Sequence, residues 1–167
     1  DEVRRRLEYF AEICRSNGLE DFTVLNVRTQ YGQDGVKNTE RFLRRYLARL
    51  GRAPLPFTAL IAGSTAGSVP APVVFREAGY SIPRDLSLCS IGSDPRAIYC
   101  IPPTSDAALH DEELAAAAID IIGRRWSGDR SPLLSQVISY RANWRESVGP
   151  PPRRRTRPSP ARRSASL

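Results

Sequence analysis

The sequence predicts an α/β fold in which helices flank a mostly parallel sheet. Short apolar runs at 57–62 and 86–91 have the length of buried strands, and amphipathic patterns at 1–17 and 36–50 have the period of helices. Because strands and helices alternate along the chain, we expect βαβ units with right-handed crossovers and helices on both faces of the sheet. The length of 167 residues corresponds to about one domain.

The stretch 78–94 joins a helix end, a turn and a strand. Gly79 supplies the positive φ that ends a helix, and Pro83 keeps the helix from resuming. The apolar run that follows is therefore predicted to be a strand, and it ends in three small or polar residues: Gly92, Ser93 and Asp94. Such residues are found at the carboxyl ends of strands in open α/β sheets, where ligands bind.

The N-terminal part predicts two helices with a strand between them. The first helix covers Asp1–Asn17 and ends at Gly18, and its apolar face holds Val3, Leu7, Phe10 and Cys14. The β-rich run Phe22–Val27 predicts a short strand. The second helix follows a glycine-rich loop and ends at Gly51, and its apolar face holds Val36, Leu43, Tyr46, Leu47 and Leu50.

The central part predicts a strand, a turn and a helix. Phe57–Ala62 is predicted to be a buried parallel strand, and residues 63–68 form the turn after it. Prolines at 70 and 72 fit only the first turn of a helix, so the next helix is expected from about 68 to 78.

The order of elements changes after Asp94. Ile101–Pro103 is expected to be an extended crossing segment, and the acidic residues from Asp111 suit the start of a helix. The buried side of that helix is predicted to hold Leu114, Ala117, Ala118, Ile121 and Ile122. Leu133–Tyr140 is a candidate for the last strand.

The net charge of +7 is concentrated at the end of the chain. Residues 153–167 contain six arginines and no acidic residue, and without these six the sequence has 19 basic and 18 acidic residues. We therefore predict a nearly neutral domain over 1–148 and a disordered basic tail over 149–167. The tail is either inert or a flexible arm that attracts polyanions.

Composition further predicts a soluble cytoplasmic protein. No apolar run reaches the ~18 residues of a membrane span, and the charged N-terminus does not resemble a secretory signal. Cys14 and Cys89 lie among apolar residues and are expected to pack as small core side chains, as in a reducing compartment.

Catalytic and metal-binding patterns are not evident in the sequence. His110 has no second histidine or cysteine nearby, so a surface or capping role is expected. Ser64 lies in AGSTAGS, which matches neither a nucleophile elbow nor a phosphate-binding loop. However, the turns at Ser64 and Thr65 and at 92–94 should open at the same edge of the sheet, which predicts a ligand pocket there.

The chain resembles the effector-sensing domain of LacI/GalR transcription regulators, which has a type I periplasmic-binding-protein-like fold. Gly79, Pro83, Asp85 and Ser87 match its signature ahead of a strand. Further matches extend from residue 1 to about 148 and include Arg6, Phe10, Thr58, Ala59, Glu77, Pro102, Pro103, Arg145 and Ser147. The resemblance implies the carboxyl half of such a sensor, and thus a partial fold.

The resemblance also implies a function and a set of ligand-binding residues. It predicts a module that binds a sugar or related effector without catalysis, cofactor or metal. The effector-contacting positions of the family correspond to Arg6, Ser64, Thr65 and Gly92, and only Arg6 retains the residue of the family. We add the neighbouring residues Ser93 and Asp94 to this set of candidates. Since the carboxylates are missing, an anionic or acceptor-rich effector, such as a sugar acid or a sugar phosphate, is expected.

Partners follow from the same resemblance. Operator DNA would be contacted only through a helix-turn-helix that this sequence does not contain, and the full-length form would be a homodimer with no membrane contact. A periplasmic sugar-binding component of a transporter is the alternative reading, and an enzyme remnant is a third.

Overall fold

The computed structural model describes residues 2–19, 21–27, 34–51, 53–92, 95–108, 110–131 and 135–152, without the side chains of 2–4 and 65. The chain divides into two compact units, Asp1–Gln33 and Asp34–Leu167, each described here by itself. In the described part of the chain, no helix is both long enough and apolar enough to cross a membrane.

The first unit contains helix α1, Glu2–Ser16, which confirms the predicted first helix. Gly18 ends it with φ +70°, and Cys14 is buried. The predicted strand at Phe22–Val27 is wrong, because the segment has no regular secondary structure and pairs with none of the four strands. Phe22 instead packs edge-on against Phe10 of α1, with ring centroids 5.6 Å apart. An aromatic side chain of this predicted strand thus packs against a helix, and the segment takes no part in a sheet.

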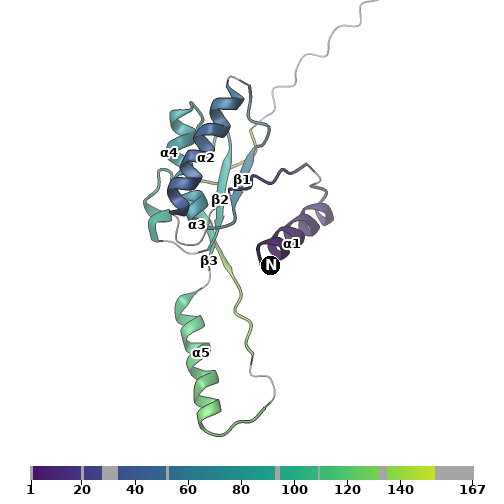
Figure 1. Cartoon of the computed structure of the whole chain (residues 1–167), viewed down its shortest axis with the longest axis vertical. Helices are drawn as coiled ribbons and strands as arrows, with labels where there is room; N and C mark the ends of the chain where they lie inside the picture. The colour runs from purple at the N-terminus through teal and green to yellow at the C-terminus, as the bar shows by residue number, and fades with distance from the viewer. Residues whose placement is uncertain are drawn as a thin grey trace, which may run out of the picture. The chain divides into compact units, whose positions relative to one another are not determined.

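The second unit contains a four-stranded sheet with the order β1-β2-β3-β4 (Figure 1). β1 (Ala59–Ala62), β2 (Ser87–Ile91) and β3 (Ser105–Ala108) are parallel, and β4 (Arg141–Asn143) is antiparallel to β3. This mostly parallel sheet with flanking helices confirms the predicted fold class.

Helices α2 (Gly35–Leu50), α3 (Thr65–Ser68) and α4 (Ala71–Glu77) pack with the sheet around the core. The buried core consists of Leu43, Leu47, Ala71, Val74, Phe75, Leu86 and Leu88. Asp34 caps α2 by accepting hydrogen bonds from the backbone nitrogens of Val36 and Lys37. The helix expected at 68–78 begins later, at Ala71, because the turn before it forms α3.

β1 is parallel, as predicted, but it is not fully buried. It forms one edge of the sheet, and Ile61 is 49% exposed. Cys89 of β2 is likewise only half-buried, although it was expected in the core, and burial raises the pKa of its thiol. Both side chains lie on the sheet face opposite to Leu88, whose side of the sheet packs in the core.

Two features near the end of the chain differ from the predictions. β3 was missed, because Ser105–Ala108 is too polar and too small to read as a strand. The last strand is Arg141–Asn143, and residues 135–140 of the predicted strand are not in a strand, while 132–134 lie outside the described residues. Because β3 has only four residues, its antiparallel partner β4 is also short, which explains why the last strand is shorter than predicted.

Helix α5, Asp111–Trp126, begins where the acidic residues predicted. Its predicted buried side is wrong, because Ala117 alone among the five residues is buried, while Leu114 and Ile122 are exposed. The helix extends beyond the end of the sheet, so little of the second unit covers it (Figure 1). A short 3₁₀ helix, η1 (Pro95–Tyr99), lies in the connection between β2 and β3.

Asp85 and Ser87 form hydrogen bonds that fix the turn before β2 and the start of the strand. Asp85 accepts a hydrogen bond from the backbone nitrogen of Ser81 at 2.7 Å, and Ser87 exchanges two hydrogen bonds of 3.1 Å with the backbone of Gly149. A β-carbon at Gly149 would lie 3.2 Å from Pro83. The segment at Gly149 is therefore fixed to the sheet, while 153–167 of the predicted tail lie outside the described residues.

Candidate ligand-binding site

The carboxyl ends of β1 and β2 meet at one edge of the sheet. Ala62 pairs with Ser90 in parallel register, so Ser64 and Gly92 each follow this pair by two residues. Ser64 is exposed and Gly92 is half-buried. The structure thus brings these two predicted site residues to the same edge, as expected for the crevice in which open α/β sheets bind ligands.

Gly92 is held by β3 and adopts a backbone conformation that favours glycine. Its φ is +112°, and its backbone nitrogen donates to the carbonyl oxygen of Ala107 at 2.8 Å. Ser93 and Asp94, the next two predicted site residues, lie outside the described residues. Thr65 begins α3, directly after Ser64.

Close packing fixes the backbone of the turn after β1. The backbone nitrogen of Gly67 donates to the carbonyl oxygen of Ser64 at 2.9 Å. A β-carbon at Gly67 would lie 3.1 Å from the β-carbon of Ala62, and one at Gly35 would lie 3.3 Å from that of Ala66. α3 therefore lies close to both β1 and α2, and the Ser64 hydroxyl is presented on a fixed backbone.

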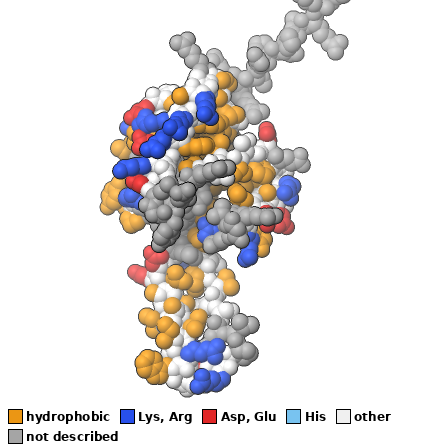
Figure 2. All heavy atoms as spheres, in the orientation of Figure 1, with side chains coloured by type: hydrophobic (Ala, Val, Ile, Leu, Met, Phe, Trp, Pro, Cys, Tyr) orange, Lys and Arg blue, Asp and Glu red, His pale blue; other side chains and the backbone are white. Residues whose placement is uncertain are grey.

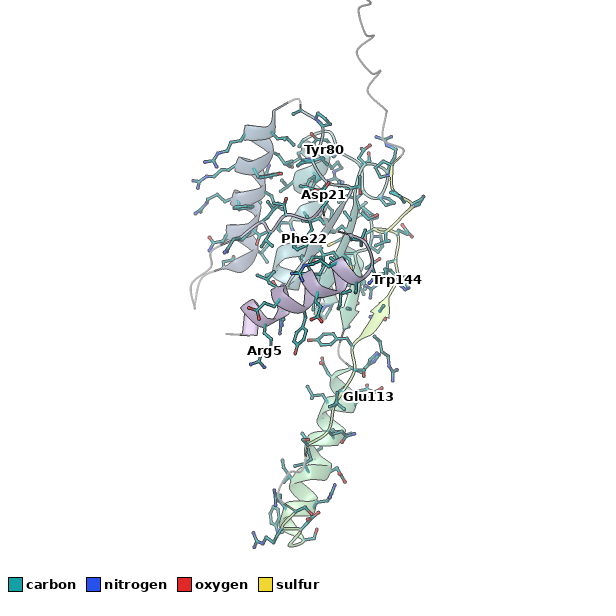
Figure 3. The ribbon with its side chains drawn as sticks, turned by 90° about the vertical axis from the view of Figure 1, so that its right-hand side faces the viewer. Arg5, Asp21, Phe22, Tyr80, Glu113 and Trp144 are labelled. Carbon is teal, nitrogen blue, oxygen red and sulfur yellow. The ribbon has the colours of Figure 1, made fainter. Side chains whose placement is uncertain are left out.

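Arg6 lies on α1 in the first unit, whereas Ser64 and Gly92 belong to the second unit. Its side chain is exposed and has an interaction partner. That Arg6 joins the other residues in one pocket therefore stays a prediction. Arg5, its neighbour on α1, points outward from the helix in Figure 3.

His110 is a candidate site residue that the sequence analysis missed. Ile91 pairs with Ala107, so the residues after β3 reach the same edge as those after β1 and β2. His110 occupies the N-cap position of α5, but its side chain is half-buried and does not cap the helix, which corrects the expected surface or capping role. Its Nε2 is buried, without a hydrogen-bond partner in the described part of the chain. The sequence analysis could have placed His110 at this edge of the sheet only if it had predicted β3 as a strand.

Asp106 on β3 is a buried carboxylate that is already used within the fold. Its Oδ1 accepts from the amide nitrogen of Asn143 at 2.7 Å, and its Oδ2 accepts from the guanidinium of Arg145 at 2.7 Å. Arg145 also donates to the carbonyl oxygen of Thr104 at 2.6 Å. Since both oxygens are engaged, this carboxylate supports the sheet rather than a ligand.

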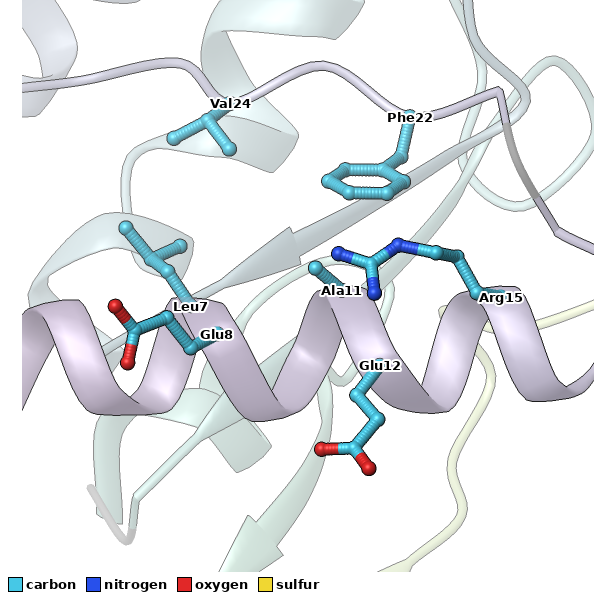
Figure 4. A pocket seen from close by; sticks show the side chains of 7 residues that line it. All are labelled: Leu7, Glu8, Ala11, Glu12, Arg15, Phe22 and Val24. Atoms are coloured by element: carbon cyan, nitrogen blue, oxygen red, sulfur yellow. The ribbon is translucent and has the colours of Figure 1, made fainter.

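The first unit contains an open groove of about 530 Å³ between α1 and the segment after it (Figure 4). Leu7, Phe22 and Val24 provide its apolar wall, and Glu8, Glu12 and Arg15 provide charged groups. Arg6 is not among its lining residues. Among the residues that the structure describes, no cluster of three or more potential ligands could hold a metal ion.

The family model of the periplasmic binding protein-like domain matches residues 1–148. The chain belongs to this family. No curated protein matches the sequence. Solved structures with the same fold include a LacI family regulator from Bifidobacterium animalis subsp. lactis, with a TM-score of 0.69 and 20% identity over 89% of this chain and 51% of that chain.

Two further solved structures share the fold. A PurR family regulator from Vibrio parahaemolyticus has a TM-score of 0.66 and 14% identity over 88% of this chain and 50% of that one. A LacI family regulator from Arthrobacter sp., in complex with lactose, has a TM-score of 0.60 and 17% identity over 68% of this chain and 41% of that one. The chain thus spans about half the length of the solved structures that it matches.

Proposed function

We propose that this chain is the effector-sensing module of a LacI-type transcription regulator and corresponds to the carboxyl half of its sensor. The observation that carries the proposal is the family match over residues 1–148 together with the parallel register of β1 and β2. The regulator from Arthrobacter that shares the fold binds lactose, which supports a sugar or sugar derivative as the effector. The role is binding, with no catalytic step.

The proposed ligand is anionic or rich in hydrogen-bond acceptors, such as a sugar acid or a sugar phosphate. Carboxylates hold neutral sugars by accepting from their hydroxyls. In this chain Thr65 and Gly92 replace the aspartates of the family, and Asp106 is occupied by its own partners. The guanidinium of Arg6 and the hydroxyls of Ser64 and Thr65 would then dominate the pocket, and a guanidinium donates to anions with two parallel hydrogen bonds.

Isothermal titration calorimetry tests this proposal with four ligands: glucuronate, a hexose phosphate, glucose and lactose. We expect the two anions to bind more tightly than the neutral sugars. Arg6→Ala should weaken anion binding at least tenfold, about 1.4 kcal/mol, because it removes the guanidinium from the pocket. Arg5→Ala is the matched control on the same helix and should leave binding unchanged. Tight binding of a neutral sugar that survives Arg6→Ala would contradict the ligand assignment.

A homodimer is part of the proposed function. Four apolar side chains lie exposed on and near η1 and α4: Val73, Ile98, Tyr99 and Ile101. Tyr99 is 80% and Ile101 is 75% exposed, and they border a groove of about 290 Å³ that is also lined by Val69 and Pro72. Arg76 and Arg96 also line the groove, and an exposed apolar patch bordered by polar residues marks a protein contact. Operator recognition would require a DNA-binding segment in addition to residues 1–148.

A further inference from the structure

A row of cations runs along the outer face of α2. Lys37, Arg41, Arg45 and Arg49 follow one another at intervals of four residues, and all four are exposed. The helical period places them opposite to the buried residues Thr39, Leu43 and Leu47. Figure 2 shows Lys and Arg side chains gathered over this part of the second unit, and Figure 3 shows nitrogen-tipped side chains projecting outward from α2.

Three members of this row are not neutralised. Arg44, on the side of α2 that meets α4, pairs with Glu40 at 2.9 Å and with Glu77 at 2.6 Å. By contrast, Arg41, Arg45 and Arg49 form no ion pair in the described part of the chain. Like charges at intervals of four residues destabilise a helix. The row therefore has an electrostatic cost that no ion pair of these three arginines offsets among the residues that the structure describes.

We propose that Arg41, Arg45 and Arg49 form a contact surface for the phosphodiester backbone of nucleic acid, independent of base sequence. Successive members lie about 6 Å apart along the helix axis, which suits a linear array of phosphates. The planar fork of arginine donates two parallel hydrogen bonds to a phosphate group. An anionic membrane fits less well, because a membrane-surface helix inserts its apolar face, and that face of α2 is buried in the core at Leu43 and Leu47.

The described chain returns, near its last residues, to the end of the second unit at which α2 ends. α2 ends at the amino-terminal edge of the sheet, where Tyr80 donates to the carbonyl oxygen of Ala53. The chain reaches that edge again at Gly149, which is bonded to Ser87 at the start of β2. Residues 153–167 then add six arginines and no acidic residue. Binding of a polyanion by these tail arginines must therefore be separated from binding by α2 in the test.

The test measures binding of the full chain to a labelled duplex of random sequence by fluorescence anisotropy at several salt concentrations. The variant Arg41→Gln/Arg45→Gln/Arg49→Gln should bind at least tenfold more weakly. The slope of log K against log salt should fall by roughly 2 to 3, since each phosphate contact contributes about 0.9. The matched control Arg124→Gln/Arg125→Gln/Arg130→Gln removes the same charge from the far end of α5 and should change neither quantity.

Three outcomes would overturn the proposal. Equal losses in the α2 variant and the α5 control would show an effect of net charge alone. The α2 effect should also persist when the six tail arginines are changed to glutamine, and its disappearance would assign the contact to the tail. Finally, α2-dependent binding to phosphatidylserine vesicles without α2-dependent binding to DNA would make the partner a lipid surface. Far-UV circular dichroism verifies that every variant is folded.

Discussion

At the scale of single residues, Asp85 shows how one carboxylate organises the turn before β2. It accepts from the backbone nitrogen of Ser81 at 2.7 Å and lies 3.4 Å from the guanidinium of Arg84. The hydrogen bond from Ser81 is the main cause that lowers the pKa of Asp85, the ion pair with Arg84 adds to it, and partial burial opposes it. The backbone nitrogen of Asp85 in turn donates to the carbonyl oxygen of Ser81, which closes the turn.

This arrangement predicts a specific dependence of stability on pH. Because the pKa is lower in the folded state than in the unfolded chain, the carboxylate stabilises the fold above its ordinary pKa of about 3.9. The contribution is lost as the pH falls through the lowered value. Asp85→Asn should reduce the free energy of unfolding by about 1 kcal/mol near neutral pH, a figure that allows for partial solvent screening. The difference from the unsubstituted protein should vanish in acid.

Urea denaturation across a pH series measures this difference. Arg84→Gln is the control, since Arg84 is largely exposed and Ser81 provides the main interaction. It should cost much less than Asp85→Asn at every pH. If the two variants were equally destabilised, the ion pair rather than the backbone hydrogen bond would hold the turn.

At the scale of elements, polar contacts join β4 and the closing segment, which we define as residues 144–149, to the rest of the sheet. The hydroxyl of Ser147 donates to the carbonyl oxygen of Leu88 at 2.6 Å and accepts from the backbone nitrogen of Ser105 at 2.7 Å. The closing segment therefore bridges β2 and β3. Asp106, Asn143 and Arg145 extend this network across β3 and β4.

The ion pair of Asp106 and Arg145 should be strongly coupled, because Asp106 is only 4% exposed. Arg145→Met leaves a buried carboxylate without its cation and should cost about 3 kcal/mol or more. Replacing both residues, as Asp106→Asn/Arg145→Met, removes the unpaired charge and should cost less than the sum of the single changes. A double-mutant cycle from urea denaturation should give a coupling energy of about 1–3 kcal/mol. Additive single effects would show that the pair does not stabilise the β3–β4 junction.

At the scale of the whole molecule, apolar side chains are exposed on several elements, and two of these places differ in their surroundings. One is the patch of Val73, Ile98, Tyr99 and Ile101 that we propose as the dimer surface. The other is α5, where Ile119 is 70% and Ile122 is 60% exposed. The surroundings of the two surfaces differ. The first borders a groove beside η1 and α4, and the second lies on α5, which reaches beyond the end of the sheet.

Separate variants of the two surfaces should therefore behave differently. Tyr99→Asp/Ile101→Asp should weaken self-association at least tenfold, because charges replace apolar contacts at the proposed interface. Ile119→Lys/Ile122→Lys should leave the sedimenting mass unchanged and reduce the binding of a hydrophobic dye. Analytical ultracentrifugation and dye fluorescence measure these effects. A monomeric unsubstituted protein, or loss of dimers in the α5 variant, would contradict the proposed interface.

The sequence by itself determined where three helices end and where the first strands lie. Glycines with positive φ end α1 and α2, and Gly79 follows α4, because local sterics require no distant partner. Apolar runs likewise identified β1 and β2, and their succession predicted that the turns at Ser64 and Gly92 meet at one edge. The family signature could also be recognised from the sequence, because Gly79, Pro83 and Asp85 lie within a few residues of one another and together form one turn.

Tertiary structure decided what depends on distant partners. β3 is a strand because Ser105–Ala108 lies between β2 and β4, where hydrogen bonds to Ser147 and Arg145 offset its polar composition. Phe22–Val27 has strand-forming residues but pairs with no strand, so composition misled the prediction. The apolar face of α5 was predicted to be buried but is largely exposed. The helical period shows only which side chains share a face, and burial of that face requires a neighbouring element to cover it.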